Sequence, residues 1–267
     1  MSADSRNHWN TFYERWKTLP PPLRPHPDGV QKIRDHLPAG NGPILLLGVT
    51  PELAVIAPNV FAVDRSEMMI AKVWPGDTPS RQVHRDDWLT MELPQHSFAA
   101  AVGDGSFNAV TYPDGQEQLY RQLLRFVKPG GSIVYRAYLT PEPCETIEAL
   151  TTFAWQRPTG SFHAFKWRLM MALVAQSGVA NVSVAEVRGL FMSLFPDRQK
   201  LAAASGWSEN DIASIDVYKD STEIYSFPTE RQFRAIVPSG IRDVTLVPAG
   251  TYELAERCPI AVMRLVE

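Results

Sequence analysis

Short apolar segments alternate with segments of helical spacing between residues 44 and 139, and this alternation restricts the fold more than any other feature. A continuous apolar run such as Ile44-Leu45-Leu46-Leu47 is typical of a strand that is buried on both faces of a sheet. Strands separated by helices at this spacing predict an α/β fold with a doubly wound, mostly parallel sheet and helices on both faces. The expected strands are residues 44–47, 59–63, 81–83, 98–102 and 132–139, and the expected helices are residues 28–37, 51–57, 66–73 and 113–127.

The C-terminal part of the chain continues the same pattern. We expect a helix over residues 229–236, with Thr229 as its N-cap, and strands over residues 244–247 and 260–265. The connection between these two strands can form a hairpin, which places an antiparallel edge on the sheet. The sheet is therefore expected to have seven strands, the last of them antiparallel.

Residues 141–227 interrupt the alternation. Helical spacing recurs there at residues 147–155, 165–176, 199–206 and 210–214, which predicts a mainly helical insertion that serves as a cap or substrate region. The predicted organisation is an N-terminal helix and proline-rich linker over residues 1–27, a core over residues 28–140 and 228–267, and the insertion over residues 141–227.

Composition limits the function classes. The chain has 267 residues with a formal net charge of −3, so we expect no nucleic-acid partner and no acidic-membrane partner. Its two cysteines, Cys144 and Cys258, form no C-x-x-C pair, and no metal site is expected. These features predict a cytoplasmic protein and leave its oligomeric state open.

Glycine-containing and polar loops follow four of the expected strands. They are Gly48-Val49-Thr50, Asp64-Arg65, Asp86-Asp87-Trp88 and Gly103-Asp104-Gly105. Because ligands of open α/β sheets bind beyond the carboxyl ends of the strands, we expect the four loops to converge on one crevice.

The chemistry of these loops suits a nucleoside ligand. Gly48 has no side chain, so a ligand can approach the backbone closely. A carboxylate at a strand end, which Asp64 provides, accepts hydrogen bonds from both ribose hydroxyls. Asp87 can accept one from an adenine amino group, and Trp88 offers an apolar face. Thr50 is expected to cap a helix whose exposed N–H groups attract a carboxylate or phosphate.

The order of these loops, together with one later segment, resembles the class I S-adenosylmethionine-dependent methyltransferases. The segment is LLRFVKPGGSIVYR, residues 123–136, which is similar to the Lys-Pro-Gly-Gly turn before the fifth strand of that family. The resemblance covers about residues 30–139 and 228–267. It implies S-adenosylmethionine as the cofactor and, since no basic patch is present, a small molecule as the methyl acceptor.

The family pattern also implies a role for each loop. Gly48 would lie against the methionine part of the cofactor, Asp64 would bind the ribose diol, and Asp87 would flank the adenine. Asp104 would lie under the sulfonium, facing the substrate, and is the candidate catalytic carboxylate. The predicted cofactor-binding residues are Gly48, Val49, Thr50, Asp64, Arg65, Asp87, Trp88, Gly103 and Asp104.

The first loop departs from the family pattern. Leu46 stands where the family usually has an acidic residue, and Thr50 and Glu52 stand where it usually has glycines. Glu52 is a candidate replacement for the missing carboxylate. The sequence therefore predicts a methyltransferase with a divergent glycine loop.

Two alternative functions remain open. The departures in the first loop favour a non-catalytic ligand-binding or interaction module that keeps the methyltransferase fold. A nicotinamide oxidoreductase on a related sheet is the third hypothesis. The absence of a G-x-G-x-x-G motif and the Lys-Pro-Gly-Gly turn both count against it.

Overall fold

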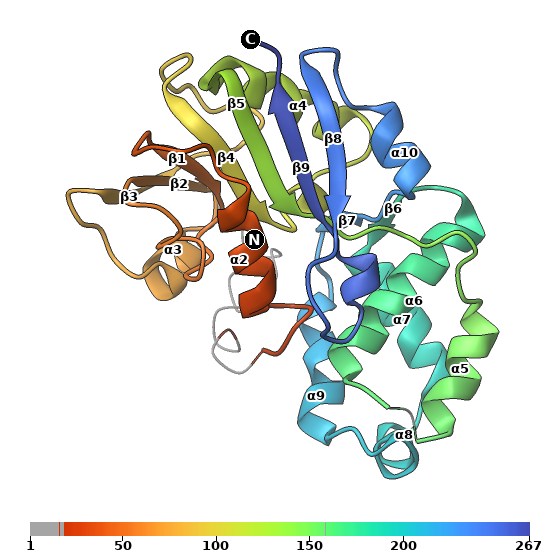
Figure 1. Cartoon of the computed structure of the whole chain (residues 1–267). Coiled ribbons are helices and arrows are strands. Elements are labelled where there is room, and N and C mark those ends of the chain that lie inside the picture. The colour runs from red at the N-terminus through yellow and green to blue at the C-terminus, as the bar shows by residue number, and fades with distance from the viewer. Residues whose placement is uncertain (1–15, 17–18, 158) are drawn as a thin grey trace.

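A seven-stranded sheet forms the centre of the protein (Figure 1). The computed structural model describes Trp16, residues 19–157 and residues 159–267, so the predicted N-terminal helix lies almost entirely outside the described residues. The strand order is β3-β2-β1-β4-β5-β9-β8. The strands are β1 (Ile44–Leu47), β2 (Val60–Asp64), β3 (Arg81–Arg85), β4 (Phe98–Asp104), β5 (Val127–Arg136), β8 (Ile241–Val247) and β9 (Ile260–Leu265).

The direction of the strands confirms the predicted fold class. Strands β1 to β5 pair in parallel, whereas β9 is antiparallel to both of its neighbours, β5 and β8. The predicted hairpin therefore exists, but its second strand, β9, enters the sheet beside β5. Strand β8 forms the edge and runs in the same direction as β5. The expected antiparallel edge is in fact an antiparallel strand one place inside the edge.

Helices cover both faces of the sheet. Successive residues of β1 point to opposite faces, and their apolar side chains pack against helices on each face. Leu45 and Leu47 pack in the same cluster as Leu119 of α4 (Asp114–Phe126). Ile44 and Leu46 pack on the other face with Ile33 of α2 (Pro27–Asp35). All four residues of β1 are buried, as its continuous apolar sequence predicts.

Two shorter helices of the sheet region begin at the predicted caps. Ser66 Oγ accepts a hydrogen bond from the N–H of Met69 at the start of α3 (Glu67–Val73). Thr229 and Gln232 form a capping box at the start of α10 (Glu230–Ala235).

The helix expected over residues 51–57 does not form. Turns occupy this segment, and the N–H groups of Leu53 and Ala54 donate to the carbonyl of Thr50. Pro58 closes this segment and has no backbone N–H with which to continue a helix. Thr50 is therefore the start of a single turn, and the first loop offers less of a helix terminus than the sequence suggests.

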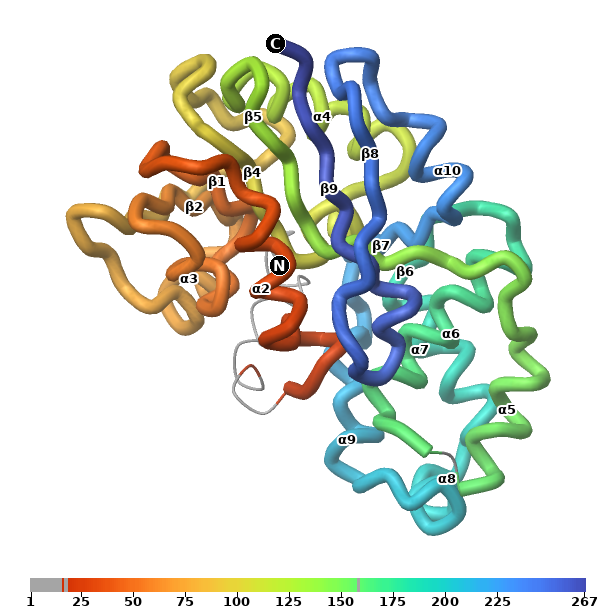
Figure 2. Tube along the Cα trace, viewed as in Figure 1, coloured from red at the N-terminus to blue at the C-terminus, as the bar shows by residue number. Residues whose placement is uncertain are grey.

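The helices within residues 147–213 lie beyond the end of the sheet at which β5 terminates (Figure 1). The chain enters them after β5 and returns through β7 and α10 to β8 (Figure 2). They pack around their own apolar cluster, which contains Leu169, Phe191 and Leu201. The elements are α5 (Ile147–Trp155), α6 (Phe162–Ser177), α7 (Val184–Leu194), α8 (Arg198–Ser205), α9 (Glu209–Ala213), and the paired strands β6 (Asn181–Ser183) and β7 (Ile224–Ser226). The division into a core and an insertion at residues 141–227 stays a prediction.

Candidate active site

A cavity of about 470 Å³ lies where the loops after β1, β2, β3 and β4 meet the segment around β7. The four loops therefore converge, as expected for an open α/β sheet. Eight of the nine predicted cofactor-binding residues line the cavity: Gly48, Val49, Thr50, Asp64, Arg65, Asp87, Trp88 and Asp104.

Gly103 is the one predicted residue that is absent from the lining. A Cβ atom at this position would lie 2.2 Å from Ser106 Oγ. Ser106 Oγ donates to the carbonyl of Leu47, at 2.9 Å, and so ties the loop after β4 to the end of β1. The glycine allows this close approach, and a direct cofactor contact by Gly103 stays a prediction.

Gly48 lines the cavity and has no side chain to fill it. Its φ is +103°, a value that L side chains rarely adopt, and its N–H donates to the carbonyl of Val63 at 2.8 Å. The same carbonyl accepts the indole N–H of Trp88 at 2.6 Å. A Cβ atom at Gly48 would lie 3.8 Å from Asp64 Oδ2 and 3.9 Å from the Trp88 ring. Gly48 therefore leaves space between a carboxylate oxygen and an aromatic edge.

Asp64 is the last residue of β2 and presents a partly desolvated carboxylate. Its Oδ1 accepts the N–H of Ser66 at 2.8 Å. Burial raises the pKa of Asp64 to about 6, although the hydrogen bond from Ser66 and the positive charge of Arg65 oppose the increase. Donors from a ligand would stabilise the ionised form, because hydrogen bonds to a carboxylate lower its pKa.

Asp87 and Trp88 hold the loop after β3 in place. Asp87 Oδ1 accepts the N–H of Leu89 at 2.8 Å, and Asp86 Oδ1 accepts the N–H of Asp87 at 2.8 Å. These local bonds form a turn that an aspartate side chain stabilises. The turn orients the Trp88 ring toward Gly48.

Asp104, the candidate catalytic carboxylate, forms a buried ion pair with Arg136. Arg136 Nε lies 2.5 Å from Asp104 Oδ1, and Arg136 Nη2 lies 3.0 Å from Asp104 Oδ2. The side chain of Arg136 is 1% exposed and that of Asp104 is 3% exposed. Arg136 Nη1 also donates to the hydroxyl of Tyr252 at 3.2 Å. Burial raises the pKa of Asp104, whereas the charge of Arg136 opposes this change. Since both oxygens are engaged, the geometry gives no support for Asp104 as a general base.

Of the three first-loop residues that depart from the family pattern, Thr50 lines the cavity, whereas Leu46 and Glu52 do not. Leu46 is fully buried in the core. Glu52 is absent from the cavity lining, and its Oε1 accepts hydrogen bonds from Arg24 Nε, at 2.9 Å, and from Arg24 Nη2. Arg24 Nη1 also donates to the carbonyl of Trp16 at 3.2 Å. The Arg24–Glu52 ion pair therefore connects the chain around Trp16 and Arg24 to the first loop.

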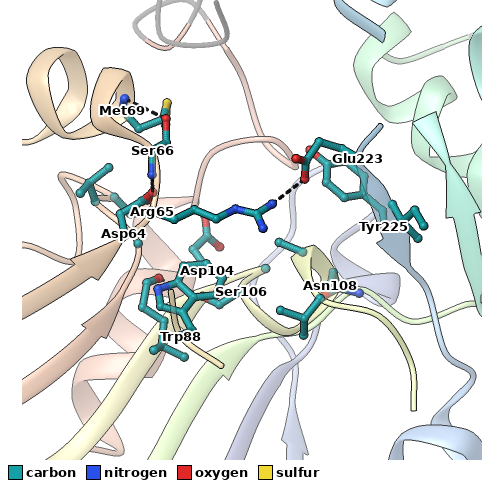
Figure 3. Close-up of a pocket in the computed structure, with 18 of the residues that line it drawn as sticks. Asp64, Arg65, Ser66, Met69, Trp88, Asp104, Ser106, Asn108, Glu223 and Tyr225 are labelled. Carbon is teal, nitrogen blue, oxygen red and sulfur yellow. Dashed lines mark hydrogen bonds and ion pairs between the residues drawn. The ribbon is translucent and has the colours of Figure 1, made fainter. Parts of the chain in front are cut away.

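The opposite side of the cavity comes from residues that the sequence did not single out as a group. Asn108 Nδ2 donates to the carbonyls of Tyr138, at 2.8 Å, and Ser226, at 2.6 Å. Arg65 reaches across the cavity and donates to Glu223 Oε2 at 2.8 Å (Figure 3). These residues are far apart in sequence, and no spacing or motif relates them. The remaining aromatic lining of this side is Tyr138, Trp167, Tyr218, Tyr225 and Phe227.

Comparisons with known proteins identify the fold. No family model and no curated protein sequence matches the chain. The CcbJ methyltransferase of Streptomyces caelestis superimposes with a TM-score of 0.56 at 13% identity, covering 100% of both chains. The N-methyltransferase NodS of Bradyrhizobium japonicum, in complex with S-adenosyl-L-homocysteine, superimposes with a TM-score of 0.54 at 12% identity, covering 98% of this chain and 100% of NodS. The chain has the class I methyltransferase fold.

A third similar structure carries a different name. A Rhodobacter sphaeroides protein provisionally named a Zn-dependent alcohol dehydrogenase matches with a TM-score of 0.64 at 10% identity, covering 99% of each chain. Within the described part of this methyltransferase-fold chain, no cluster of three or more His, Cys, Asp or Glu side chains could hold a metal ion. The antiparallel β9 also differs from the wholly parallel 3-2-1-4-5-6 order of dinucleotide-binding sheets.

Over Trp16 and residues 19–157 and 159–267, no helix combines the length and apolar character that crossing a bilayer needs.

Proposed function

We propose that this chain binds S-adenosylmethionine and transfers its methyl group to a small-molecule acceptor. One observation carries the proposal: Gly48, Asp64 and Trp88 surround the same end of a cavity at the carboxyl edge of a methyltransferase-fold sheet. A carboxylate, an open glycine and an aromatic edge are the groups that an adenosine ligand needs.

The residues present fit the adenosine part of the cofactor. The space that a side chain at Gly48 would fill lies beside Asp64 Oδ2 and the Trp88 ring. Asp64 would accept the ribose hydroxyls, and Trp88 would contact the adenine. The cofactor supplies an activated methyl group on a sulfonium, so the protein's main tasks are to orient the acceptor and to exclude water. The aromatic side of the cavity supports both tasks.

Isothermal titration calorimetry with S-adenosyl-L-homocysteine tests the proposal. We expect binding by the wild-type chain and at least tenfold weaker binding by Asp64→Asn, because each hydrogen bond to a charged group contributes roughly 1.5–3 kcal/mol. A wild-type chain that binds neither this product nor S-adenosylmethionine at millimolar concentration would contradict the proposal.

A non-catalytic ligand-binding or interaction module is the second candidate function. It is favoured by the first loop, where Leu46 is buried and Glu52 is paired with Arg24. The two functions differ in calorimetry, because the module predicts no heat of binding for any adenosyl ligand.

A further inference from the structure

The side of the cavity that faces away from Gly48 has an aromatic wall. The ring centroids of Tyr138 and Trp167 are 4.0 Å apart, and those of Trp167 and Phe227 are 6.2 Å apart. Tyr225 extends the wall, with its ring centroid 6.5 Å from that of Phe227. Such a wall packs against an apolar or aromatic molecule, and it also attracts a cation through the negative faces of its rings.

Glu223 places a carboxylate beside this wall. Its side chain is 10% exposed, whereas the side chain of its partner, Arg65, is 51% exposed. In Figure 3, Arg65 approaches Glu223 from the opposite side of the cavity, where Asp64 lies. Because the Arg65 guanidinium is half-exposed, it can move into solvent, and a ligand cation can then take its place at Glu223.

The charges of the lining favour a cationic ligand over an anionic one. The described lining residues include five acidic side chains and one basic side chain, Arg65, and none of them is a histidine or a lysine. A carboxylate or phosphate acceptor would meet Glu223 as a like charge. A phenol acceptor is neutral and would leave the Glu223 carboxylate without a counter-charge once Arg65 is displaced.

We propose that the methyl acceptor is a primary or secondary amine with an apolar or aromatic body, whose nitrogen replaces the Arg65 guanidinium at Glu223. This inference rests on the proposed methyltransferase function. The apolar body packs against Tyr138, Trp167 and Phe227. Glu223 is thereby the residue that selects a nitrogen acceptor.

The reaction balances with Glu223 as the proton acceptor. The ammonium of the acceptor gives one proton to the Glu223 carboxylate, which exposes the nitrogen lone pair. The nitrogen attacks the methyl carbon, an N–C bond forms, and the C–S bond breaks with its electron pair passing to sulfur. The products are the N-methylated ammonium and a neutral thioether, and Glu223 returns its proton to solvent at the cavity mouth.

Matched probes separate an amine site from a merely apolar one. We would titrate 2-phenylethylamine and tryptamine, and the corresponding alcohols 2-phenylethanol and tryptophol, into the wild-type chain saturated with S-adenosyl-L-homocysteine. We expect each amine to bind at least about tenfold more tightly than its alcohol, since a buried hydrogen-bonded charge pair adds more than this factor. Glu223→Gln should remove the difference, and Glu230→Gln, an exposed carboxylate of α10, should preserve it.

The outcomes distinguish the two proposals. If S-adenosyl-L-homocysteine itself does not bind, the proposed function fails. If it binds but the amines bind no better than the alcohols, or not at all at 10 mM, the amine inference is overturned. Unchanged amine affinity in Glu223→Gln would also overturn it. A cooperative urea unfolding transition of Glu223→Gln serves as the folding control.

Discussion

Replacing Asp64 by asparagine should stabilise the protein while it weakens cofactor binding. Burial raises the pKa of Asp64 from 3.8 to about 6, so the folded state holds the ionised carboxyl less favourably than the unfolded chain does. One pKa unit corresponds to about 1.36 kcal/mol, and the penalty is therefore about 3 kcal/mol at pH 7.5. An asparagine can keep the hydrogen bond from the Ser66 N–H, which isolates the loss of charge.

The pH dependence of this effect follows from the direction of the shift. A raised carboxyl pKa means that the folded state binds more protons than the unfolded state between pH 3.8 and about 6, so the stabilisation conferred by the protonated form is lost as the pH rises through this window. The advantage of Asp64→Asn should therefore be about 1.5 kcal/mol at pH 5 and about 3 kcal/mol at pH 7.5. Wild-type affinity for S-adenosyl-L-homocysteine should fall about tenfold between pH 7.5 and pH 5, because the ligand requires the ionised form.

Urea unfolding followed by tryptophan fluorescence at the two pH values measures the stability difference, and calorimetry measures the affinity. Glu67→Gln is the matched control, because it removes a carboxylate three residues further along, at the first residue of α3, where the side chain is 73% exposed. We expect it to change stability by less than about 0.5 kcal/mol. If Asp64→Asn is destabilising at pH 7.5, or if its effect does not vary with pH, the carboxyl is not desolvated as the structure indicates and the reasoning is refuted.

Three further substitutions and one glycine control test the site. Gly48→Ala and Gly40→Ala should each lose about 1–3 kcal/mol of stability, because both glycines have φ above +100°. Only Gly48→Ala should weaken binding of S-adenosyl-L-homocysteine in calorimetry. Equal affinities of the two variants for this ligand would exclude Gly48 from the site. Asp104→Asn should lose about 3–5 kcal/mol in urea unfolding because it leaves Arg136 buried without its counter-charge, and a loss below about 1 kcal/mol would show that the ion pair is open to solvent. Glu52→Gln should change the same affinity less than about threefold, since the pair with Arg24 is partly exposed. A tenfold loss would instead identify Glu52 as a ligand of the methionine amino group.

The strands and helices of the sheet region could be predicted from the sequence because each is specified by residues within its own segment. The four apolar residues of β1 and the spacing of α4 each report burial directly, and the caps Ser66 and Thr229 mark helix starts within one residue. The position of β9 could not be predicted in the same way. A hairpin specifies that β8 and β9 pair, but which of them contacts β5 depends on packing across the sheet.

The convergence of the strand-end loops was predictable for a related reason. Asp64 and Asp104 are the last residues of β2 and β4, so topology alone brings them to one edge. The ion pair of Asp104 was not predictable, because its partner, Arg136, lies at the end of a different strand, β5. A sequence pattern identifies which side chains reach an edge, whereas the choice between an ion pair and a free base depends on distances of a few tenths of an ångström.

The aromatic wall has no local signature, and this difference has a physical origin. Short loops whose geometry follows from the sheet form one side of the cavity, whereas the aromatic wall combines Tyr138 after β5, Trp167 on α6 and Phe227 after β7. Arg65 belongs to both sides, because it follows the Asp64 carboxylate in the chain and pairs with Glu223 across the cavity. If an amine displaces Arg65 from Glu223, the released guanidinium stays beside Asp64, where its positive charge favours the ionised carboxylate that the ribose requires. Acceptor binding and cofactor binding would then strengthen each other through a single side chain, and by linkage the effect must be equal in both directions.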